Sequence, residues 1–285
     1  MEYSENLRLW LSEIKSEIRF WDRLFATQGK EGGDPQIFKF RTDPKCPFQI
    51  PNDLEKENSK ILDVGSGPYS RLGYWYNNKK VDLTLVDPLA FAYKELEKKY
   101  GYKFAHSPQT GMVECLSITL PENEYDLVHM SNSLDHSFDP IEGIKQLLYV
   151  TKIGGKVILR HHNNVAEKEN YQGLHQWNLT TEKGRFIVWN KNTKLDMNDY
   201  LNDFATIEFA APSEERTLDS KWQFQKIVIR KNKRFECPPI YAGAILTSLC
   251  DHIMMKNIDE YKNSKLVFFK RLLNILNANR FILFR

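Results

Sequence analysis

Seven histidines are the side chains of this chain best suited to acid–base chemistry near neutral pH. His136 stands directly after Asp135 in the polar segment NSLDHS, where the carboxylate can orient the imidazole as a general base. The same pair, together with Asn132, has the donor types of a divalent-metal site. The alternative is that both residues cap a helix around Pro140. We expect no bound metal and take Asp135 and His136 as candidate catalytic residues.

Other histidines lie in segments of different character. His129 lies inside the apolar run YDLVHMS and is interpreted as a buried core residue. His161 and His162 end another apolar run, and strand side chains alternate between faces, so at most one of them is expected to reach a site. His162 is kept as a candidate. His175 stands two residues before Trp177, and this pairing suits the recognition of a sugar or base ring. The alternative is that Trp177 only pins the loop to the core.

A glycine-rich turn in ILDVGSGPYS (61–70) raises the question of its ligand. Gly65 and Gly67 resemble the start of a dinucleotide fingerprint, but a serine stands where the third glycine would be. A dinucleotide places its pyrophosphate on the N-terminus of the following helix. Here Pro68 removes one N–H donor, and the carboxylate of Asp63 would repel phosphate. Both features suit S-adenosylmethionine (SAM), which has no phosphate and carries an ammonium and a sulfonium.

An acidic residue follows at the distance expected for ribose binding. Asp87 closes the next apolar run, 20 residues after Gly67, where a carboxylate can accept hydrogen bonds from ribose hydroxyls. The alternative is that Asp87 only caps a helix beginning at Pro88. Together with the glycine turn, the spacing favours ribose.

The elements that must position these residues follow an alternating pattern. Apolar periodicity indicates an α/β protein with a Rossmann-like, doubly wound sheet that is mostly parallel, has helices on both faces and ends in an antiparallel strand. A helix should also begin near Pro68. The expected strands are 60–65, 81–87, 102–106, 125–131, 155–162, 205–211 and 222–230. The expected helices are 4–27, 88–101 and 139–152.

Pattern changes divide the chain into segments. We expect an N-terminal helix followed by an irregular connector (1–58), and a SAM-binding domain (59–235) with an insertion at about 163–200. A C-terminal helical extension (236–285) should follow. Its basic amphipathic end (264–285) is expected to pack on the fold or on a second copy of the chain, and the alternative is contact with an anionic membrane surface.

Composition sets wider limits on the class of protein. Of 285 residues, 41% are hydrophobic and 27% charged, which is typical of a soluble globular protein. We expect no membrane span, no secretory signal and four reduced cysteines, and hence a cytoplasmic protein. From Lys221 onward the chain has 13 basic and 4 acidic residues. Such a region can face an anionic substrate, a nucleic acid, a membrane or only solvent.

Four motifs together resemble the class I SAM-dependent methyltransferases. They are ILDVGSGP, LTLVDP, YDLVHMSNSLDHSFDP and GGKVILRHH, and they cover residues 60–162, with the antiparallel finish extending the likeness to 230. The resemblance implies that the two glycines approach the methionine part, that Asp87 holds the ribose, and that Val113 and Glu114 lie near the adenine. The expected cofactor-binding residues are Asp63, Gly65, Gly67, Asp87, Pro88, Val113, Glu114 and Ser131.

Two further segments, NSLDHS and YQGLHQWN, are similar to those of bacterial methyltransferases of surface-polysaccharide biosynthesis. This resemblance implies O-methylation of a sugar, a nucleotide-linked sugar or a phosphate-containing precursor of capsule or lipopolysaccharide. The candidate catalytic residues are Asp135, His136, His162 and His175. Alternatives are a nucleic-acid or small-molecule N-methyltransferase, an NAD-dependent oxidoreductase and an inactive SAM-binding protein; nucleic acid is not expected as a partner.

Overall fold

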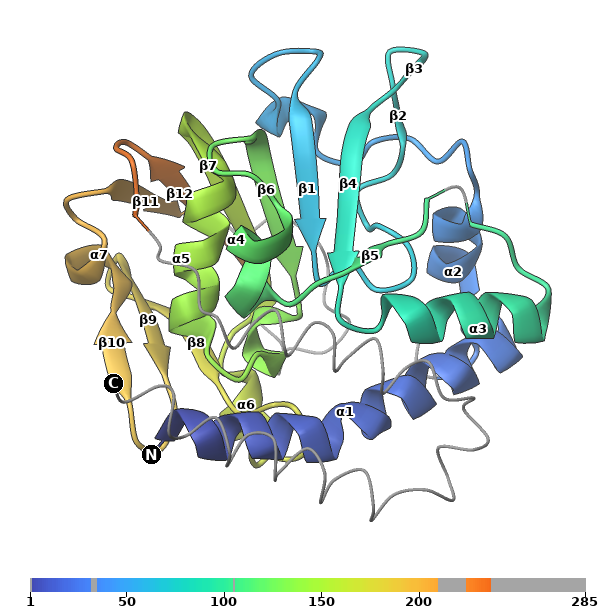
Figure 1. The fold of residues 1–285 in the computed structure, drawn as a ribbon, viewed down its shortest axis with the longest axis horizontal. Coiled ribbons are helices and arrows are strands. Elements are labelled where there is room, and N and C mark those ends of the chain that lie inside the picture. Colours follow the sequence, from blue (N-terminus) through green and yellow to red (C-terminus); the bar gives the residue numbers. More distant parts are fainter. Residues whose placement is uncertain (1, 32–34, 105, 210–223, 237–285) are drawn as a thin grey trace.

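A seven-stranded sheet forms the centre of the computed structural model, which describes residues 2–31, 35–104, 106–209 and 224–236 (Figure 1). The predicted C-terminal extension, apart from its first residue, and its basic end (264–285) lie outside the described residues. The strand order is β11-β12-β7-β6-β1-β4-β5. These strands are β1 (Lys60–Val64), β4 (Asp82–Asp87), β5 (Gln109–Thr110), β6 (Tyr125–Ser131), β7 (Thr151–His162), β11 (Ala205–Phe209) and β12 (Phe224–Lys231).

The pairing directions confirm the predicted fold class. From β7 to β5 every neighbouring pair is parallel, whereas β12 is antiparallel to both β7 and β11. The chain leaves β1 toward β4 and later returns to β6 on its other side. This reversal of direction makes the carboxyl end of β1 the topological switch point, where ligands bind in open α/β sheets.

Helices cover one face of the sheet and its carboxyl edge. Figure 1 shows α4 and α5 in front of the strands and α1 crossing beneath their carboxyl ends. An apolar stripe on α1, which includes Trp10, Ile14 and Phe25, is buried in a cluster with residues of α2 and α3. The helices are α1 (Glu2–Thr27), α2 (Pro35–Thr42), α3 (Ala90–Tyr100), α4 (Leu116–Thr119), α5 (Pro140–Val150), α6 (Val165–Lys168) and α7 (Met197–Tyr200). Three 3-10 turns are η1 (Pro51–Asp53), η2 (Val113–Cys115) and η3 (Leu134–His136).

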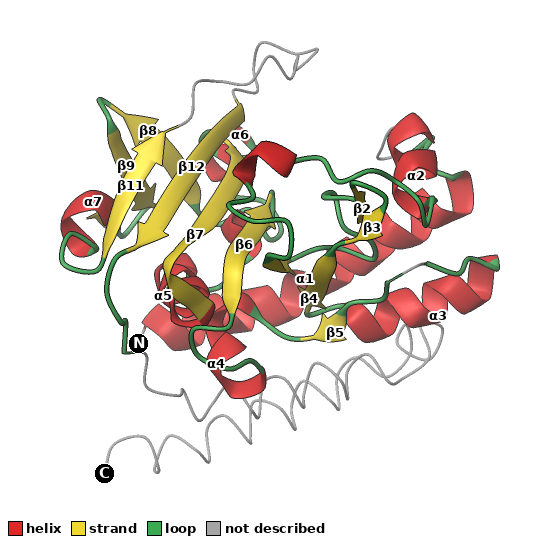
Figure 2. Ribbon diagram, turned by 90° about the horizontal axis from the view of Figure 1, so that it is seen from above, coloured by secondary structure: helices red, strands yellow, loops and turns green. Residues whose placement is uncertain are grey.

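The helix expected near Pro68 is absent from the structure. Turns and bends follow Gly67 instead, and they lead into the short hairpin of β2 (Trp75–Tyr76) and β3 (Lys79–Lys80). The second face of the sheet is therefore covered by apolar residues of the connector and of this turn, among them Phe48, Leu72 and Tyr74. Figure 2 shows α2 and the hairpin on the side of the sheet opposite α4 and α5.

Two other local predictions were wrong. The connector is not wholly irregular, since it holds α2 and η1. No strand forms among the described residues of 102–106, and the edge strand β5 comes later in the chain. The insertion contains an antiparallel sheet of β8 (Asn178–Glu182), β9 (Arg185–Trp189) and β10 (Lys194–Asp196). A Lys183–Gly184 turn with φ of 49° and 73° joins its first two strands, which is the backbone of a tight hairpin.

The described residues also bear on the predictions made for membrane spans, cysteines and Trp177. No helix in the described ranges is long and apolar enough to cross a membrane. Cys46 and Cys115 are buried free thiols. Trp177 is 4% exposed and lies in the main apolar cluster, so it pins its loop to the core and is not available to stack on a ligand.

Candidate functional site

A cavity of about 960 Å³ lies at the carboxyl edge of the sheet, bounded by α1 and α2. Its size is at the upper end of the usual range for ligand pockets, about 300–1,000 Å³, so it has room for two ligands. All the candidate residues from the sequence line it: Asp63, Gly65, Gly67, Asp87, Pro88, Val113, Glu114, Ser131, Asn132, Asp135, His136, His162 and His175.

The glycine turn after β1 requires its two glycines. Gly65 and Gly67 have φ of 62° and 67°, a region that other residues rarely adopt. A Cβ on Gly65 would overlap the hydroxyl of Ser133, and one on Gly67 would lie 3.0 Å from Cζ2 of Trp21. The N–H of Gly65 donates to the carbonyl of Val86 at 2.8 Å, which ties the turn to β4.

Asp87 connects this turn to the start of α3. Its Oδ2 accepts from the N–H of Gly67 at 2.9 Å, and its Oδ1 accepts from the N–H of Leu89 at 2.8 Å. The hydroxyl of Tyr93 also bonds to it. Burial raises the pKa of Asp87 to about 7, against the lowering effect of the backbone donors. The bond to Leu89 closes a turn ahead of α3, whose N-cap is Leu89 and has no side-chain cap bond, so Asp87 lines the cavity without capping the helix.

Asp63 shares a buried network with a histidine that the sequence placed in the core. Its Oδ1 lies 2.7 Å from Nδ1 of His129, and its Oδ2 accepts from the hydroxyl of Ser70 at 2.6 Å. His129 is fully buried, as predicted, but it also lines the cavity. The two residues are register partners on neighbouring parallel strands, which is the signal that could have paired them in advance.

Unpartnered polar atoms gather where β6 ends. Oγ of Ser131, Oδ1 of Asn132 and Oγ of Ser133 are buried and have no hydrogen-bond partner in the part of the chain that the structure describes. Buried polar atoms normally have partners, because losing water without replacement is costly. All three residues line the cavity, so their open positions favour a polar ligand there.

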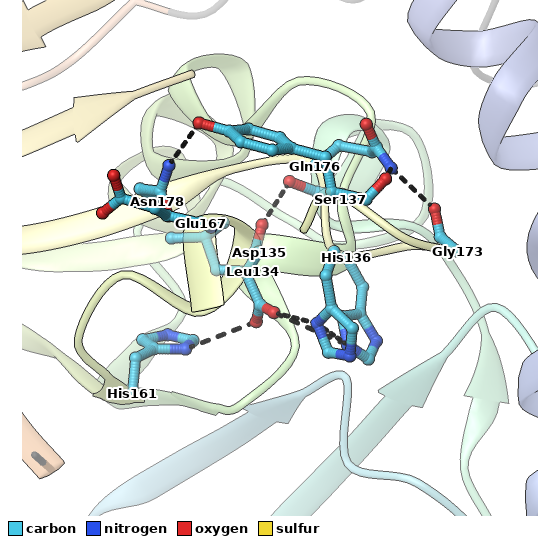
Figure 3. A network of polar contacts seen from close by, with 11 residues as sticks. Leu134, Asp135, His136, Ser137, His161, Glu167, Gly173, Gln176 and Asn178 are labelled. Atoms are coloured by element: carbon cyan, nitrogen blue, oxygen red, sulfur yellow. Dashed lines mark hydrogen bonds and ion pairs between the residues drawn. The ribbon is translucent and has the colours of Figure 1, made fainter. Parts of the chain in front are cut away.

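Asp135 lies at the centre of a histidine cluster (Figure 3). Its Oδ2 is 2.8 Å from Nδ1 of His175 and 3.5 Å from Nε2 of His136, and these two nitrogens are 3.1 Å apart. Its Oδ1 is 3.9 Å from Nδ1 of His161. Burial acts to raise the pKa of Asp135, but the charge of His136 and the hydrogen bond with His175 lower it well below its usual range.

The two histidines at the end of β7 divide as strand alternation predicts. His162 lines the cavity, and burial together with the charge of Arg71 lowers its pKa. His161 does not line the cavity and is 1% exposed, and burial lowers its pKa to about 4. Even so, it faces the cluster through Asp135.

Val113 and Glu114, expected near the adenine, reach the cavity, but the carboxyl group of Glu114 is bonded to backbone N–H groups of the protein. Oε1 of Glu114 accepts from the N–H of Phe138 at 2.8 Å and from that of Asp139 at 3.3 Å. Burial raises the pKa of Glu114 to about 8. Val113 is buried against Gly143 of α5. An adenine contact of Glu114 therefore remains a prediction.

Sequence reasoning missed the residues that the N-terminal segments bring to the cavity. Glu17 and Trp21 come from α1, and the indole N–H of Trp21 donates to Glu17 at 3.0 Å. Arg41 comes from α2, and Arg71 from the loop after β1. No short-range pattern could show which residues of α1 and α2 face a sheet that forms later in the chain.

Comparison with known proteins gave likeness in structure only. No family model and no curated protein matches the chain. The CurJ carbon methyltransferase aligns with 63% of this chain and 50% of its own, at 14% identity and a TM-score of 0.40. A SAM-dependent methyltransferase from Aquifex aeolicus aligns with 73% of this chain and 97% of its own, at 13% identity and 0.38. The methyltransferase CalH, solved with SAH, aligns with 73% and 62%, at 10% identity and 0.39.

At these identities and scores, the assignment depends on features of the chain itself. The parallel strands, the reversed β12 between β7 and β11, and the glycine turn at the switch point are present together. The chain therefore has the Rossmann-like fold of the class I SAM-dependent methyltransferases.

Proposed function

We propose that this protein binds SAM in the cavity and transfers its methyl group to an oxygen atom of a second ligand. The observation that carries the proposal is the convergence at the switch point. One cavity is lined by the two glycines of positive φ, by Asp87, which accepts from Gly67, and by the unpartnered oxygens after β6. The Asp135 cluster lines the same cavity. A polar ligand without phosphate groups suits the first part of this cavity, and an acid–base reaction suits the second.

The residues present suit the parts of SAM. Asp87 and Glu17 are carboxylates that line the cavity and are proposed to accept from the ribose hydroxyls. The charge of Glu17 contributes to the raised pKa of Asp87. The unpartnered oxygens of Ser131, Asn132 and Ser133 can accept from an ammonium, and the two serine hydroxyls can also donate to a carboxylate. Met112 and Val113 give the buried apolar wall that an adenine ring requires.

A dinucleotide suits the same turn poorly. No helix follows Gly67, so the site lacks the row of N–H groups and the dipole that bind a pyrophosphate. The indole of Trp21 also covers Gly67, where a pyrophosphate would have to approach the backbone. These observations disfavour an NAD-dependent reaction.

The Asp135 cluster can prepare the acceptor. SAM supplies a methyl group on a sulfonium, and a hydroxyl acceptor must lose its proton as it reacts. Oδ2 of Asp135 lies 2.8 Å from Nδ1 of His175. A similar carboxylate–imidazole contact joins Asp63 and His129 in the same cavity. His136 or His175 is proposed to remove the proton, and a positioned base of this kind contributes about 10²–10⁴-fold to the rate.

Two arginines indicate the chemical class of the acceptor. Arg41 and Arg71 line the cavity, and burial together with the charge of Arg71 lowers the pKa of Arg41 to about 10. Two guanidinium groups near each other favour an anion between them. This supports a sugar phosphate, a nucleotide-linked sugar or a phosphate-containing precursor, as the resemblance to methyltransferases of surface-polysaccharide biosynthesis implies.

Calorimetry with SAM and with NAD tests the proposal. We expect SAM and its demethylated product to bind at micromolar concentrations. Asp87→Ala should weaken SAM binding about tenfold or more, because hydrogen bonds to a carboxylate are lost.

His136→Ala should leave SAM affinity unchanged while lowering the methylation rate of a nucleotide-sugar acceptor about 10²–10⁴-fold. Absence of SAM binding, or tight NAD binding, would exclude the proposed activity.

A further inference from the structure

Three donor atoms in the Asp135 cluster converge on one point at the edge of the cavity. Oδ2 of Asp135, Nε2 of His136 and Nδ1 of His175 are separated by 2.8, 3.1 and 3.5 Å. They come from two separate parts of the chain, η3 and the loop before β8. We propose that Asp135, His136 and His175 hold a divalent metal ion that binds the oxygen atom to be methylated.

Hydrogen bonds cannot join all three pairs of these atoms at once. An imidazole nitrogen carries either one hydrogen or one lone pair, and an ionised carboxylate only accepts. If Nδ1 of His175 gives its hydrogen to Asp135, it has no lone pair for an N–H of His136. If it keeps a lone pair, it faces the carboxylate with no hydrogen between them. A cation at the centre accepts a lone pair from all three atoms at once.

The spacing of the three atoms matches metal coordination. Bonds of about 2.1 Å from a metal to nitrogen or oxygen separate neighbouring donors by about 3.0 Å in octahedral and about 3.4 Å in tetrahedral geometry. The observed separations of 2.8, 3.1 and 3.5 Å span these values. Two imidazoles and one carboxylate suit Zn²⁺, Co²⁺ or Mn²⁺, and three protein ligands leave positions open for an acceptor oxygen.

The chain holds both ligand segments in place. The N–H of His136 donates to the carbonyl of Ser133 at 3.1 Å, which closes η3. The side chain of Gln176 donates to the carbonyls of Tyr171 and Gly173 at 2.9 and 2.8 Å, so the loop that carries His175 is fixed (Figure 3). Such supporting bonds orient metal ligands in other proteins.

His161 provides a further sign of a cation. Its two ring nitrogens are buried and have no hydrogen-bond partner among the described residues, yet Nδ1 lies 3.9 Å from the second oxygen of Asp135. In the described structure, the ion-pair partners of this buried carboxylate are all histidines. The group therefore lacks a permanent positive charge, which a divalent ion supplies.

The role of the ion rests on the proposed function. A metal-bound hydroxyl has a lower pKa than a free one, so the acceptor releases its proton to water more readily. Its oxygen then forms a bond to the methyl carbon while the carbon–sulfur bond breaks, and the sulfonium becomes a neutral thioether. With the ion bound, His136 and His175 are its ligands, and the role of base proposed for them above applies only to a site that binds no metal.

Metal titration of the untagged, chelator-treated protein tests the site. We expect one Zn²⁺ ion by calorimetry and a Co²⁺ absorption spectrum with nitrogen ligands. His136→Ala and His175→Ala should each weaken binding about 100-fold or more, since even the partners of metal ligands contribute about 10–100-fold. His106→Ala is the control, because His106 stacks on Tyr74 away from the cavity. Both ligand positions are only partly buried, and thermal unfolding verifies that the variants fold.

Each outcome separates the two proposals. If Zn²⁺, Co²⁺ and Mn²⁺ all fail to bind, or if His175→Ala binds them as tightly as the unmodified protein, the metal site is wrong and the cluster is a carboxylate–histidine base. SAM binding by the metal-free protein would then still support the proposed function. Metal binding without SAM binding would uphold the site and refute its proposed role.

Discussion

Asp87 lies at the cavity as its place in the sequence suggested, and its contact with ribose stays a prediction. Its two oxygens accept from the N–H groups of Gly67 and Leu89, and Tyr93 bonds to it as well. An ionised carboxylate has about four acceptor positions, so about one remains for a ribose hydroxyl. The second hydroxyl then needs another partner, and Glu17 of α1, which lines the same cavity and contributes to the raised pKa of Asp87, is proposed for it. The expected pair of bonds from ribose to Asp87 alone is thus reduced to one.

The raised pKa of Asp87 makes cofactor binding depend on pH. Burial raises this pKa from 3.8 to about 7, so the carboxyl is largely neutral below pH 7. A hydroxyl donor favours the ionised form, and binding therefore releases a proton. We expect SAM affinity to rise with pH by up to about tenfold per unit below pH 7 and to level off above it. Calorimetry from about pH 5.5 to 8.5 measures this.

Asp87→Asn is the matched variant for that measurement, because an amide has the same shape and does not titrate. Its SAM affinity should be weaker at pH 8 and should vary little between pH 6 and 8. An affinity that falls as pH rises in the unmodified protein would contradict the assignment. So would an Asp87→Asn variant that keeps the full pH dependence.

At the scale of elements, regular periodicity predicted the parallel core well. The bounds of β6 agree with the predicted 125–131, and β4 differs by one residue. Both are apolar runs with clear boundaries, where local pattern and burial agree. The helix expected after Gly67 failed because Gly67 and Gly73 adopt positive φ and the turn instead covers the second face of the sheet. That choice depends on contacts with the connector, which lies far from it in sequence.

Lys231 joins two elements by a contact that no local pattern predicts. Its fully buried ammonium, on the last residue of β12, donates to the carbonyls of Leu148 and Thr151 at 2.7 and 2.8 Å. These carbonyls lie at the C-terminal end of α5, where carbonyls lack partners within the helix and the dipole is negative. Burial lowers the pKa of Lys231 to about 8. Lys231 thus holds α5 against the reversed strand.

Lys231→Met should destabilise the protein by about 3 kcal/mol, because charged hydrogen bonds are lost and buried carbonyls are left without donors. Urea unfolding followed by circular dichroism measures the change. Lys233→Met is the control, since its side chain is exposed and a surface substitution changes stability by about 0.5 kcal/mol or less. Equal unfolding midpoints for the two variants would show that the buried contact contributes little.

At the scale of the whole molecule, the sequence predicted the site residues that lie at the carboxyl ends of parallel strands. Parallel strands bring their carboxyl ends to one edge, so Gly65, Asp87, Ser131 and His162 were expected together. His175 was included on residue type, and the structure shows its contact with Asp135. Arg41 and the α1 residues could not be placed, because the packing of the N-terminal segments across that edge is set by the apolar cluster of α1, α2 and α3.

This packing brings acidic and basic side chains to the same cavity. Glu17, Asp87 and Glu114, which are proposed to face the cofactor, and Arg41 and Arg71, which are proposed to face the acceptor, line the same cavity. Arg41 lies 5.8 Å above the ring of Tyr69, which fixes the guanidinium within the cavity. A cavity with both kinds of side chain should bind a cationic ligand and an anionic ligand at the same time.

Binding of a nucleotide diphosphate tests this prediction. With SAH present, we expect UDP to bind to the unmodified protein and Arg41→Gln to weaken it about tenfold or more, since a charged hydrogen bond and its favourable field are lost. SAM affinity should change less than UDP affinity in this variant, because SAM carries no phosphate for Arg41 to bind. Lys39→Gln, an exposed change on the same helix, controls for net charge. If UDP and a neutral sugar bind equally to both proteins, the acceptor is not an anion, and the polysaccharide-precursor proposal loses its main structural support.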